Sequence, residues 1–319
     1  MRSVTFFDGS GWRAGVVEAV DGRARLRDDV PSTEFAPLDG VIVGGFTDHH
    51  VHLQLVDHAQ LAGSRLGRVV DLGGDPDALR TLAAHERPVR VEFAGAFLTA
   101  PGGYPSDRSW APKGAVREIA DADAAAEAVA EMAAAGASRL KVTSNSAAGP
   151  VLPDVLFRTV VGLAADHGLP VVAHAEGPGE AQRVARLGAA LLAHAPFTER
   201  LDDEEIARQT ASVSWISTLA IHDGPVQEIA VDNVRRFHAA GGTVRYGTDL
   251  GNGPMPVDLN PREVAALRKA GLDTIALLRA LDPVDPLDPD AVLLLLPRAT
   301  PASADPLDAR PLTPADLKV

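Results

Sequence analysis

The sequence predicts an α/β protein, a (β/α)8 barrel of the TIM type with a small accessory β-structure made by its N- and C-terminal segments. From Val41 onward, apolar strand-like runs alternate with alanine-rich helical stretches. Runs that are apolar on both faces and separated by helices indicate a parallel sheet. The chain has 319 residues, and about eight strand–helix units can be counted in it, which is the number that closes such a sheet into a barrel.

The predicted elements follow one another in a regular rhythm. Each of four clear helices is followed directly by a glycine, the residue that favours the left-handed end of a helix. These helices are expected at residues 122–135, 156–167, 180–187 and 226–240. The strands are expected at residues 41–48, 68–72, 89–98, 139–143, 170–175, 189–195, 212–220 and 243–248.

The two ends of the chain have a different character. Asp8–Gly11 and Asp21-Gly22 separate short apolar runs and predict hairpins within the first forty residues. Near the other end, the apolar run 291–296 is expected to pair back with these hairpins; the alternative is that it packs on the barrel and a loose tail follows. We therefore expect an accessory β-region of residues 1–40 and 285–319 and a barrel of residues 41–284.

The composition argues against several classes of function. Acidic residues number 43 and basic residues 30, for a formal net charge of -13, so nucleic acid and anionic membranes are poor partners. The absence of cysteine excludes disulfides and thiolate metal sites. No signal-peptide pattern and no apolar stretch of roughly 18 residues is found. We expect a cytoplasmic protein that acts on a small molecule, with a homo-oligomer as one possible assembly.

Two histidines end the first predicted barrel strand. His50 and His52 are two residues apart, so both side chains lie on one face of the strand while His49 faces the other way. The pair would point toward the carboxyl-terminal mouth of the barrel, where barrel enzymes have their sites. Taken alone, a His-x-His pair is weak evidence, because histidines also cluster by chance.

The same placement recurs on other strands. His174, His194 and Asp249 each follow an apolar run at the end of a predicted strand. A single buried histidine could be a hydrogen-bonded core group, but burying all five side chains without a common partner would be costly. A divalent cation explains them together, since imidazole and carboxylate suit Zn, Mn, Fe and Ni. Lys141, at the end of the fourth strand, belongs with this set, and the alternative is a salt bridge, for instance to Asp249.

Here the residues resemble a known family. The segment Gly44–His52 is similar to the "PGFID-x-H-x-H" opening of the amidohydrolase superfamily, and the resemblance covers about residues 41–280. The segments 94–103, 174–177 and 217–219 are similar to the branch of Xaa-Pro dipeptidases and imidazolonepropionases. The remaining polar residues follow in the order of the superfamily, strand by strand: Lys141, His174, His194 and Asp249.

The resemblance implies a divalent metal, zinc first of all, and about two ions per chain. The implied ligands are His50, His52, Lys141, His174, His194 and Asp249. The first two histidines and the aspartate would hold one ion, the other two histidines the second, and the lysine, carbamylated by CO2, would bridge them. A metal-activated hydroxide would be the nucleophile. Asp249 would be the catalytic residue that takes its proton and passes it to the leaving nitrogen.

The implied function is hydrolysis of a C–N amide-type bond in a cyclic amide, an N-acyl amino acid or a dipeptide. The alternative in the same superfamily is a deaminase of a heterocycle. Such deaminases usually use one metal and usually lack the bridging lysine, so Lys141 favours the amide hydrolase. A remote alternative is a non-catalytic scaffold, but scaffolds typically lose ligands and none of the six is missing here.

Three further residues are candidate substrate contacts. Tyr104 and Arg108 lie in the loop after the third strand, and loops at this end of a barrel carry binding residues. A guanidinium binds a carboxylate through two parallel hydrogen bonds, so Arg108 would recognise an acidic substrate. The alternative is a surface ion pair of Arg108 with Asp107. His222 follows the seventh strand and either reaches the site or lies exposed in its loop.

Overall fold

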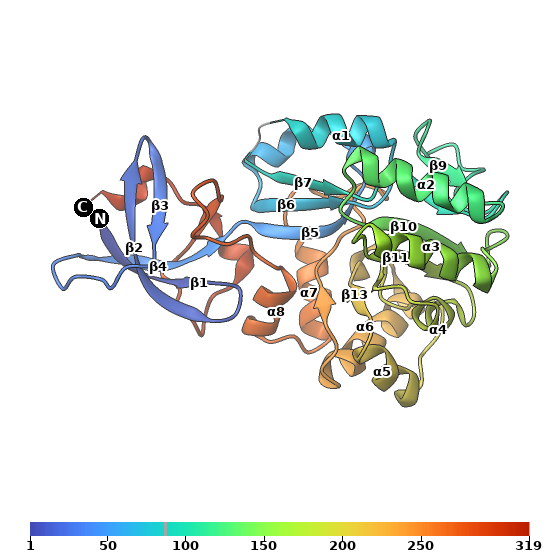
Figure 1. Ribbon diagram of the computed structural model, residues 1–319. Coiled ribbons are helices and arrows are strands. Elements are labelled where there is room, and N and C mark those ends of the chain that lie inside the picture. Colours follow the sequence, from blue (N-terminus) through green and yellow to red (C-terminus); the bar gives the residue numbers. More distant parts are fainter. Residues whose placement is uncertain (86–87, 319) are drawn as a thin grey trace.

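The computed structural model describes residues 1–85 and 88–318, which form a barrel with a β-sheet beside it (Figure 1). The first barrel strands, β5 (Phe46–Val51), β6 (Leu66–Asp71) and β7 (Arg90–Phe93), form one parallel sheet. The other strands form a second parallel sheet in the order β14-β13-β12-β11-β10-β8-β9. Their bounds are β8 (Phe97–Thr99), β9 (Val116–Glu118), β10 (Leu140–Asn145), β11 (Val171–Glu176), β12 (Leu191–Leu192), β13 (Ser214–Ile216) and β14 (Val244–Arg245).

Hydrogen bonds between the first and last barrel strands close the wall. The His49 amide donates to the Tyr246 carbonyl over 3.0 Å, and the His52 amide donates to the Leu250 carbonyl over 2.7 Å. The third barrel strand is divided into β7 and β8 around Gly95, whose φ is +78°. β7 pairs with β6 and β8 pairs with β10, so the wall remains continuous across this break. The predicted (β/α)8 barrel is confirmed.

Helices cover the outside of the barrel (Figure 1). α2 turns Ala125, Val129 and Met132 to the core, and it ends at Gly136 in a left-handed conformation. The four predicted helices are α2, α3, α4 and α6, and each of the four glycines that follow them has a positive φ. No helix in residues 1–85 and 88–318 is long and apolar enough to cross a membrane. The helices are α1 (Pro76–Ala84), α2 (Ala122–Ala135), α3 (Asp154–Asp166), α4 (Glu180–Arg186), α5 (Asp203–Thr210), α6 (Gly224–Ala239), α7 (Pro261–Lys269) and α8 (Thr274–Ala280), with 3-10 turns η1 (Leu53–Leu55), η2 (His58–Gly63), η3 (Leu219–Ile221), η4 (Pro306–Asp308) and η5 (Pro314–Leu317).

Both ends of the chain contribute to a mixed sheet beside the barrel (Figure 1), where Arg2 Nε donates to the Leu317 carbonyl over 3.3 Å. β1, β2 and β3 form the predicted hairpins, with Asp21 and Gly22 at positive φ in the second turn. β15 joins the same sheet as these hairpins, as expected for the run 291–296, but it pairs with β4 and not with a hairpin strand. The division of the chain at residues 40 and 285 stays a prediction. The strands are β1 (Arg2–Phe7), β2 (Trp12–Val20), β3 (Arg23–Arg27), β4 (Pro37–Gly44), β15 (Leu293–Pro297) and β16 (Arg310–Pro311).

The single strand predicted at 41–48 is wrong, because this run is two strands in different sheets. β4 belongs to the mixed sheet and β5 to the barrel, and the chain passes between them at Gly45. A Cβ on Gly45 would lie 2.6 Å from the backbone of Gly67, so the crossing requires a glycine. Residues 41–51 are all buried, and an apolar run that continues from one strand to the next contains no sequence signal of the boundary.

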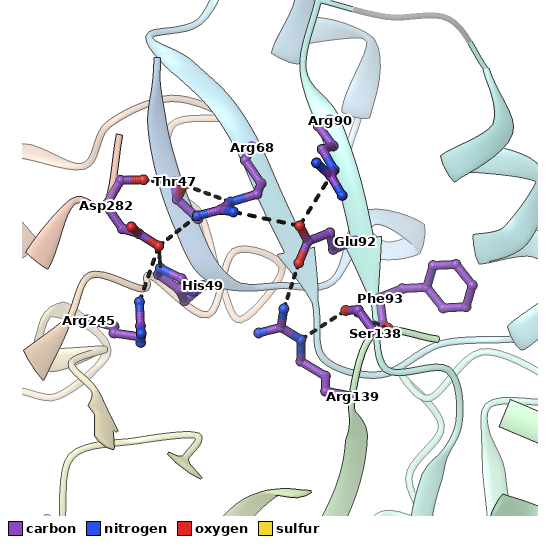
Figure 2. A network of polar contacts seen from close by, with 10 residues as sticks. All are labelled: Thr47, His49, Arg68, Arg90, Glu92, Phe93, Ser138, Arg139, Arg245 and Asp282. Atoms are coloured by element: carbon purple, nitrogen blue, oxygen red, sulfur yellow. Dashed lines mark hydrogen bonds and ion pairs between the residues drawn. The ribbon is translucent and has the colours of Figure 1, made fainter. Parts of the chain in front are cut away.

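A network of ion pairs lies inside the barrel toward the amino-terminal ends of the strands (Figure 2). Arg68 and Arg245 both donate to Asp282, over 2.6 and 3.2 Å. His49 joins the network with its Nε2 3.1 Å from the same carboxylate, so it points away from its two neighbouring histidines, as strand alternation predicts. A small buried cluster follows further along the strands: Val70, Leu72, Ala94, Val172, Ala193 and Ile216. The opposite, carboxyl-terminal end of the barrel is therefore the open one.

Candidate metal centre

The six side chains predicted as metal ligands line one cavity at the mouth of the barrel. This cavity has a volume of about 510 Å³. Three of the side chains follow β5, β12 and β14, and the other three lie within β5, β10 and β11, where Lys141 is the second residue of β10 and not, as predicted, at the end of its strand. None is more than 7% exposed. They are His50, His52, Lys141, His174, His194 and Asp249.

Three of them form the tightest group. Ligand atoms of His50, His52 and Asp249 all lie within 4.8 Å of one another. Asp249 Oδ1 is 3.1 Å from the Nε2 of His50 and 3.2 Å from the Nε2 of His52. Two imidazole nitrogens and one carboxylate oxygen that converge in this way are a donor set that could hold a divalent metal ion.

Hydrogen bonds on the far side of the two imidazole rings select their tautomers. His50 Nδ1 lies 2.8 Å from the Ala193 carbonyl, and His52 Nδ1 lies 3.0 Å from the Gly73 carbonyl. A carbonyl oxygen can only accept, so each neutral ring carries its proton on Nδ1 and leaves a lone pair on Nε2. Both rings therefore present to the cavity the nitrogen that a cation requires, already oriented by the protein.

The other two histidines stand beside this group. His194 Nδ1 lies 2.9 Å from the Thr218 hydroxyl, so the Nε2 of His194 is the ring nitrogen that is not used in this contact. His174 uses its Nε2 for Glu176, at 3.2 Å, so Nδ1 is its free nitrogen. The ring centroid of His194 is 4.7 Å from that of His50 and 4.9 Å from that of His174. The four imidazoles thus form one continuous cluster.

Lys141 is buried within this cluster. Its Nζ lies 3.4 Å from His50 Nε2. Burial lowers the pKa of Lys141 to about 7, against the opposing attraction of Asp249 and Asp71. Among the described residues, no carboxylate is within ion-pair distance of this ammonium, so the direct salt bridge to Asp249 is not formed. A substantial fraction of the amine is therefore neutral and nucleophilic near neutral pH.

The electrostatics of the site suit a cation. Burial lowers the pKa of His50 and of His194 well below its usual range, and the neighbouring positive groups lower it further, so both rings are neutral at pH 7. Burial alone would raise the pKa of Asp249, but the surrounding imidazoles outweigh it and hold this pKa well below its usual range. Burial would also lower the pKa of His52, but its hydrogen bond with Asp249 and the attraction of that carboxylate outweigh burial and raise this pKa. Neutral imidazoles and a charged carboxylate are the protonation state in which such ligands bind a metal, so a bound metal would displace any proton on His52 Nε2.

Two supporting residues were not found from the sequence. Asn252 donates its Nδ2 to Asp249 Oδ2 over 2.9 Å, and Asp249 itself has a φ of +56° in the turn after β14. Asn145 donates its Nδ2 to Glu176 Oε2 over 2.7 Å and so holds the carboxylate that contacts His174. An Asn-Gly pair at 252–253 signals a turn, but nothing in the sequence says which side chain the turn approaches.

The predicted substrate contacts differ in their placement. Tyr104 and His222 line the cavity, and the Tyr104 ring stacks on His174 with centroids 5.3 Å apart. Arg108 is not among the cavity-lining residues in the described part of the chain. Its Nε is 3.4 Å from Asp107 Oδ1, and its guanidinium carbon is 5.6 Å from the Tyr104 ring centroid. A role for Arg108 in binding stays a prediction.

Solved structures with a similar fold cover nearly the whole chain. A Xaa-Pro dipeptidase with bound methionine has a TM-score of 0.70 and 17% identity over 99% of this chain and 98% of that chain. Phenylurea hydrolase B has a TM-score of 0.70 and 15% identity over 98% and 95%, and A. niger ochratoxinase has 0.69 and 15% over 97% and 93%. No family model and no curated protein sequence matches this chain. Across its full length, the chain therefore has the fold of solved amidohydrolase and Xaa-Pro dipeptidase structures.

Proposed function

We propose that this chain is a metal-dependent hydrolase of the amidohydrolase superfamily that cleaves a C–N amide-type bond in a small molecule. The observation that carries the proposal is the convergence of His50, His52 and Asp249, with both imidazoles in the ligand tautomer, at the mouth of an amidohydrolase-type barrel. When bound, a divalent cation lowers the pKa of water and polarises a carbonyl.

The proposed metal is zinc, with about two ions per chain. The tight group of two histidines and one aspartate would hold one ion. His174 and His194 would hold the other, and Lys141, carbamylated on its amine, would lie between them. The lowered pKa of Lys141 supports this role, because only the neutral amine reacts with CO2.

Asp249 is the proposed proton carrier. Water adds to the carbonyl carbon, its proton moves to the carboxylate of Asp249, and that proton then passes to the leaving nitrogen as the C–N bond breaks. The products are a carboxylic acid and an amine. Asp249 is suited to this step because it lines the cavity and its two oxygens have different partners, the imidazoles at Oδ1 and Asn252 at Oδ2.

The similar structures carry the names of a dipeptidase, a phenylurea hydrolase and an ochratoxinase. These names support hydrolysis as the reaction type, but the three proteins are named for different substrates. The fold therefore does not identify the substrate of this chain, which must be inferred from the residues that line the cavity and tested by experiment.

The test is a substrate screen with the zinc-loaded protein. Dipeptides, N-acyl amino acids, cyclic amides, anilides and amino-substituted heterocycles are incubated with it, and released amine and released ammonia are measured separately. We expect amine and carboxylic acid from at least one amide, released at least about 100-fold more slowly by the Asp249→Asn variant. Ammonia from a heterocycle, without cleavage of any amide, would assign the chain to the deaminases instead.

A further inference from the structure

We propose that the substrate is an uncharged amide with a flat aromatic or bulky apolar group beside the scissile bond, and that a carboxylate on this group is rejected. The inference rests on the proposed function, because it concerns the substrate of the same cavity. It follows from the side chains that form the cavity wall around the candidate metal ligands.

One part of the wall is aromatic. Phe97, Tyr104 and Trp110 line the cavity from β8 and the loop that follows it. The Trp110 centroid is 6.1 Å from that of Tyr104 and 6.0 Å from that of Phe97, and the Phe97 centroid is 5.7 Å from that of His52. Trp110 is 39% exposed, so a ligand ring packed on it would remove a large apolar surface from water.

A second part of the wall lies farther round the barrel. Phe197, after β12, and Ile221, in η3, line the cavity, and the Phe197 centroid is 4.3 Å from that of His222. Burial lowers the pKa of His222 from 6.5, so its ring is neutral at neutral pH. Its Nε2 is buried and has no hydrogen-bond partner within the described ranges. His222 is thus the neutral polar side chain in this part of the wall, and it offers no charge to a substrate.

The charged groups that line the cavity disfavour a negatively charged substrate. In the part of the chain that the structure describes, no guanidinium lines the cavity, and the one ammonium there is Lys141, which lies 3.4 Å from His50 inside the proposed ligand set. Glu176 also lines the cavity, with its carboxylate 2.7 Å from Asn145 Nδ2 and 3.2 Å from His174 Nε2. Against the described parts of the wall away from the proposed metal ligands, a substrate carboxylate would lose hydration and find no guanidinium or free ammonium as a counter-ion, and beside Glu176 it would face another carboxyl group.

Arg108 is the cation on which recognition of a carboxylate would depend. It lies outside the lining residues, and Asp107 is already within 3.4 Å of it. A substrate carboxylate would have to compete with this neighbour for the guanidinium. The inference and the sequence-based expectation for Arg108 therefore make opposite predictions, which a charge series can decide.

The first experiment measures binding to the zinc-loaded protein. Three acetanilides that differ only in their para substituent, methyl, trimethylammonium or carboxylate, are titrated against the fluorescence of Trp110. Trp110→Phe is the control that identifies the source of the signal, because Trp12 and Trp215 remain in it. We expect the methyl probe to bind at least about tenfold more tightly than the carboxylate probe. Equal or tighter binding of the carboxylate, or no saturable binding of the methyl probe, would overturn the inference.

The second experiment changes the charge of the wall. Ile221→Lys should improve binding of the carboxylate probe relative to the methyl probe by about tenfold, while Ile221→Met, of similar length, should not. Arg108→Met should leave this ratio unchanged. A selective loss of carboxylate binding in Arg108→Met would overturn the inference and support the earlier expectation.

Turnover of the same probes separates the two proposals. Binding with the expected charge preference, but without release of any amine or ammonia from the compounds of the substrate screen, would contradict the hydrolase and keep the inference. Cleavage that favours carboxylated substrates would contradict the inference and keep the hydrolase.

Discussion

At the scale of single residues, the two oxygens of the Asp249 carboxylate have separate partners. Oδ1 faces the Nε2 atoms of His50 and His52, and Oδ2 accepts a hydrogen bond from Asn252. Contacts on both sides hold the carboxylate in one orientation. Substitutions of Asp249 and of Asn252 therefore test different aspects of one arrangement, the proton carrier and its positioning.

We expect Asp249→Asn to keep the fold and to lower kcat by about 100- to 10,000-fold, the usual contribution of a general acid–base group. The amide has the same shape as the carboxylate but cannot carry the proton. Steady-state kinetics on the substrate found by the screen, with circular dichroism as the control for folding, measures this effect. An activity close to wild type would show that another residue carries the proton.

Asn252→Leu should lower kcat by about 10- to 150-fold and change KM little, because a hydrogen bond to a charged acceptor contributes roughly 1.5–3 kcal/mol and leucine cannot donate one. Asn252→Gln, which retains the amide, is the matched variant and should recover part of the loss. Kinetics that show a raised KM with an unchanged kcat would mean that Asn252 contacts the substrate instead of positioning Asp249.

At the scale of elements, α7 supports one part of the cavity wall through η3. Glu263, on α7, accepts a hydrogen bond from the Ala220 amide over 2.6 Å, and the carboxyl is fully buried. Ile221 and His222, which line the cavity, come directly after this contact. The position of this part of the wall therefore depends on a helix that does not itself reach the cavity lining.

Stability should depend on pH through Glu263. Burial raises the pKa of this carboxyl from 4.5 to about 7. Between these values the folded protein holds a proton that the unfolded chain releases, so the free energy of unfolding falls as the pH rises through this window. Glu263→Gln has no such titration, and its stability relative to wild type should rise by roughly 1–3 kcal/mol between about pH 5 and pH 8. Urea unfolding across this range measures it, and a difference that is constant with pH would contradict the assignment.

Helices were easier to predict from the sequence than strands. The predicted helix at 122–135 has the bounds of α2, since alanine-rich composition and a terminal glycine are local signals. The strand predicted at 189–195 is only β12, Leu191–Leu192. A strand ends where its hydrogen bonds to neighbouring strands end, and that information lies in distant parts of the chain.

At the scale of the whole molecule, β4 and β15 connect the mixed sheet to the barrel, because successive side chains along each strand pack alternately in the core of the barrel and in the core of the mixed sheet. Val41 and Val43 belong to the main core, together with barrel residues, whereas Ile42 packs in a separate cluster of the mixed sheet. Leu294 and Leu295 divide between the same two cores. Both faces of these strands are buried, which explains why both stretches are apolar without alternation.

Metal removal should affect the whole molecule. A cation that binds only the folded state stabilises it by mass action, so chelation should lower Tm by roughly 5 °C or more and added zinc should restore it. Elemental analysis of protein prepared without chelator should find about two ions per chain, falling to about one in Lys141→Met. Circular dichroism melting of the same samples measures the shift. A stoichiometry near zero that zinc does not raise would contradict the metallohydrolase.

By itself, the sequence determined the class of fold and the candidate ligand set. Periodic apolar runs, glycines after helices and polar residues after strands are local patterns, and each is readable along the chain. Only the tertiary structure decided how these residues meet. It brought Asn252 to Asp249, placed Arg108 beside Asp107 outside the cavity lining, and left the described wall without a guanidinium. The cavity is made by loops from different strands, and which side chains converge there depends on contacts between residues far apart in the sequence.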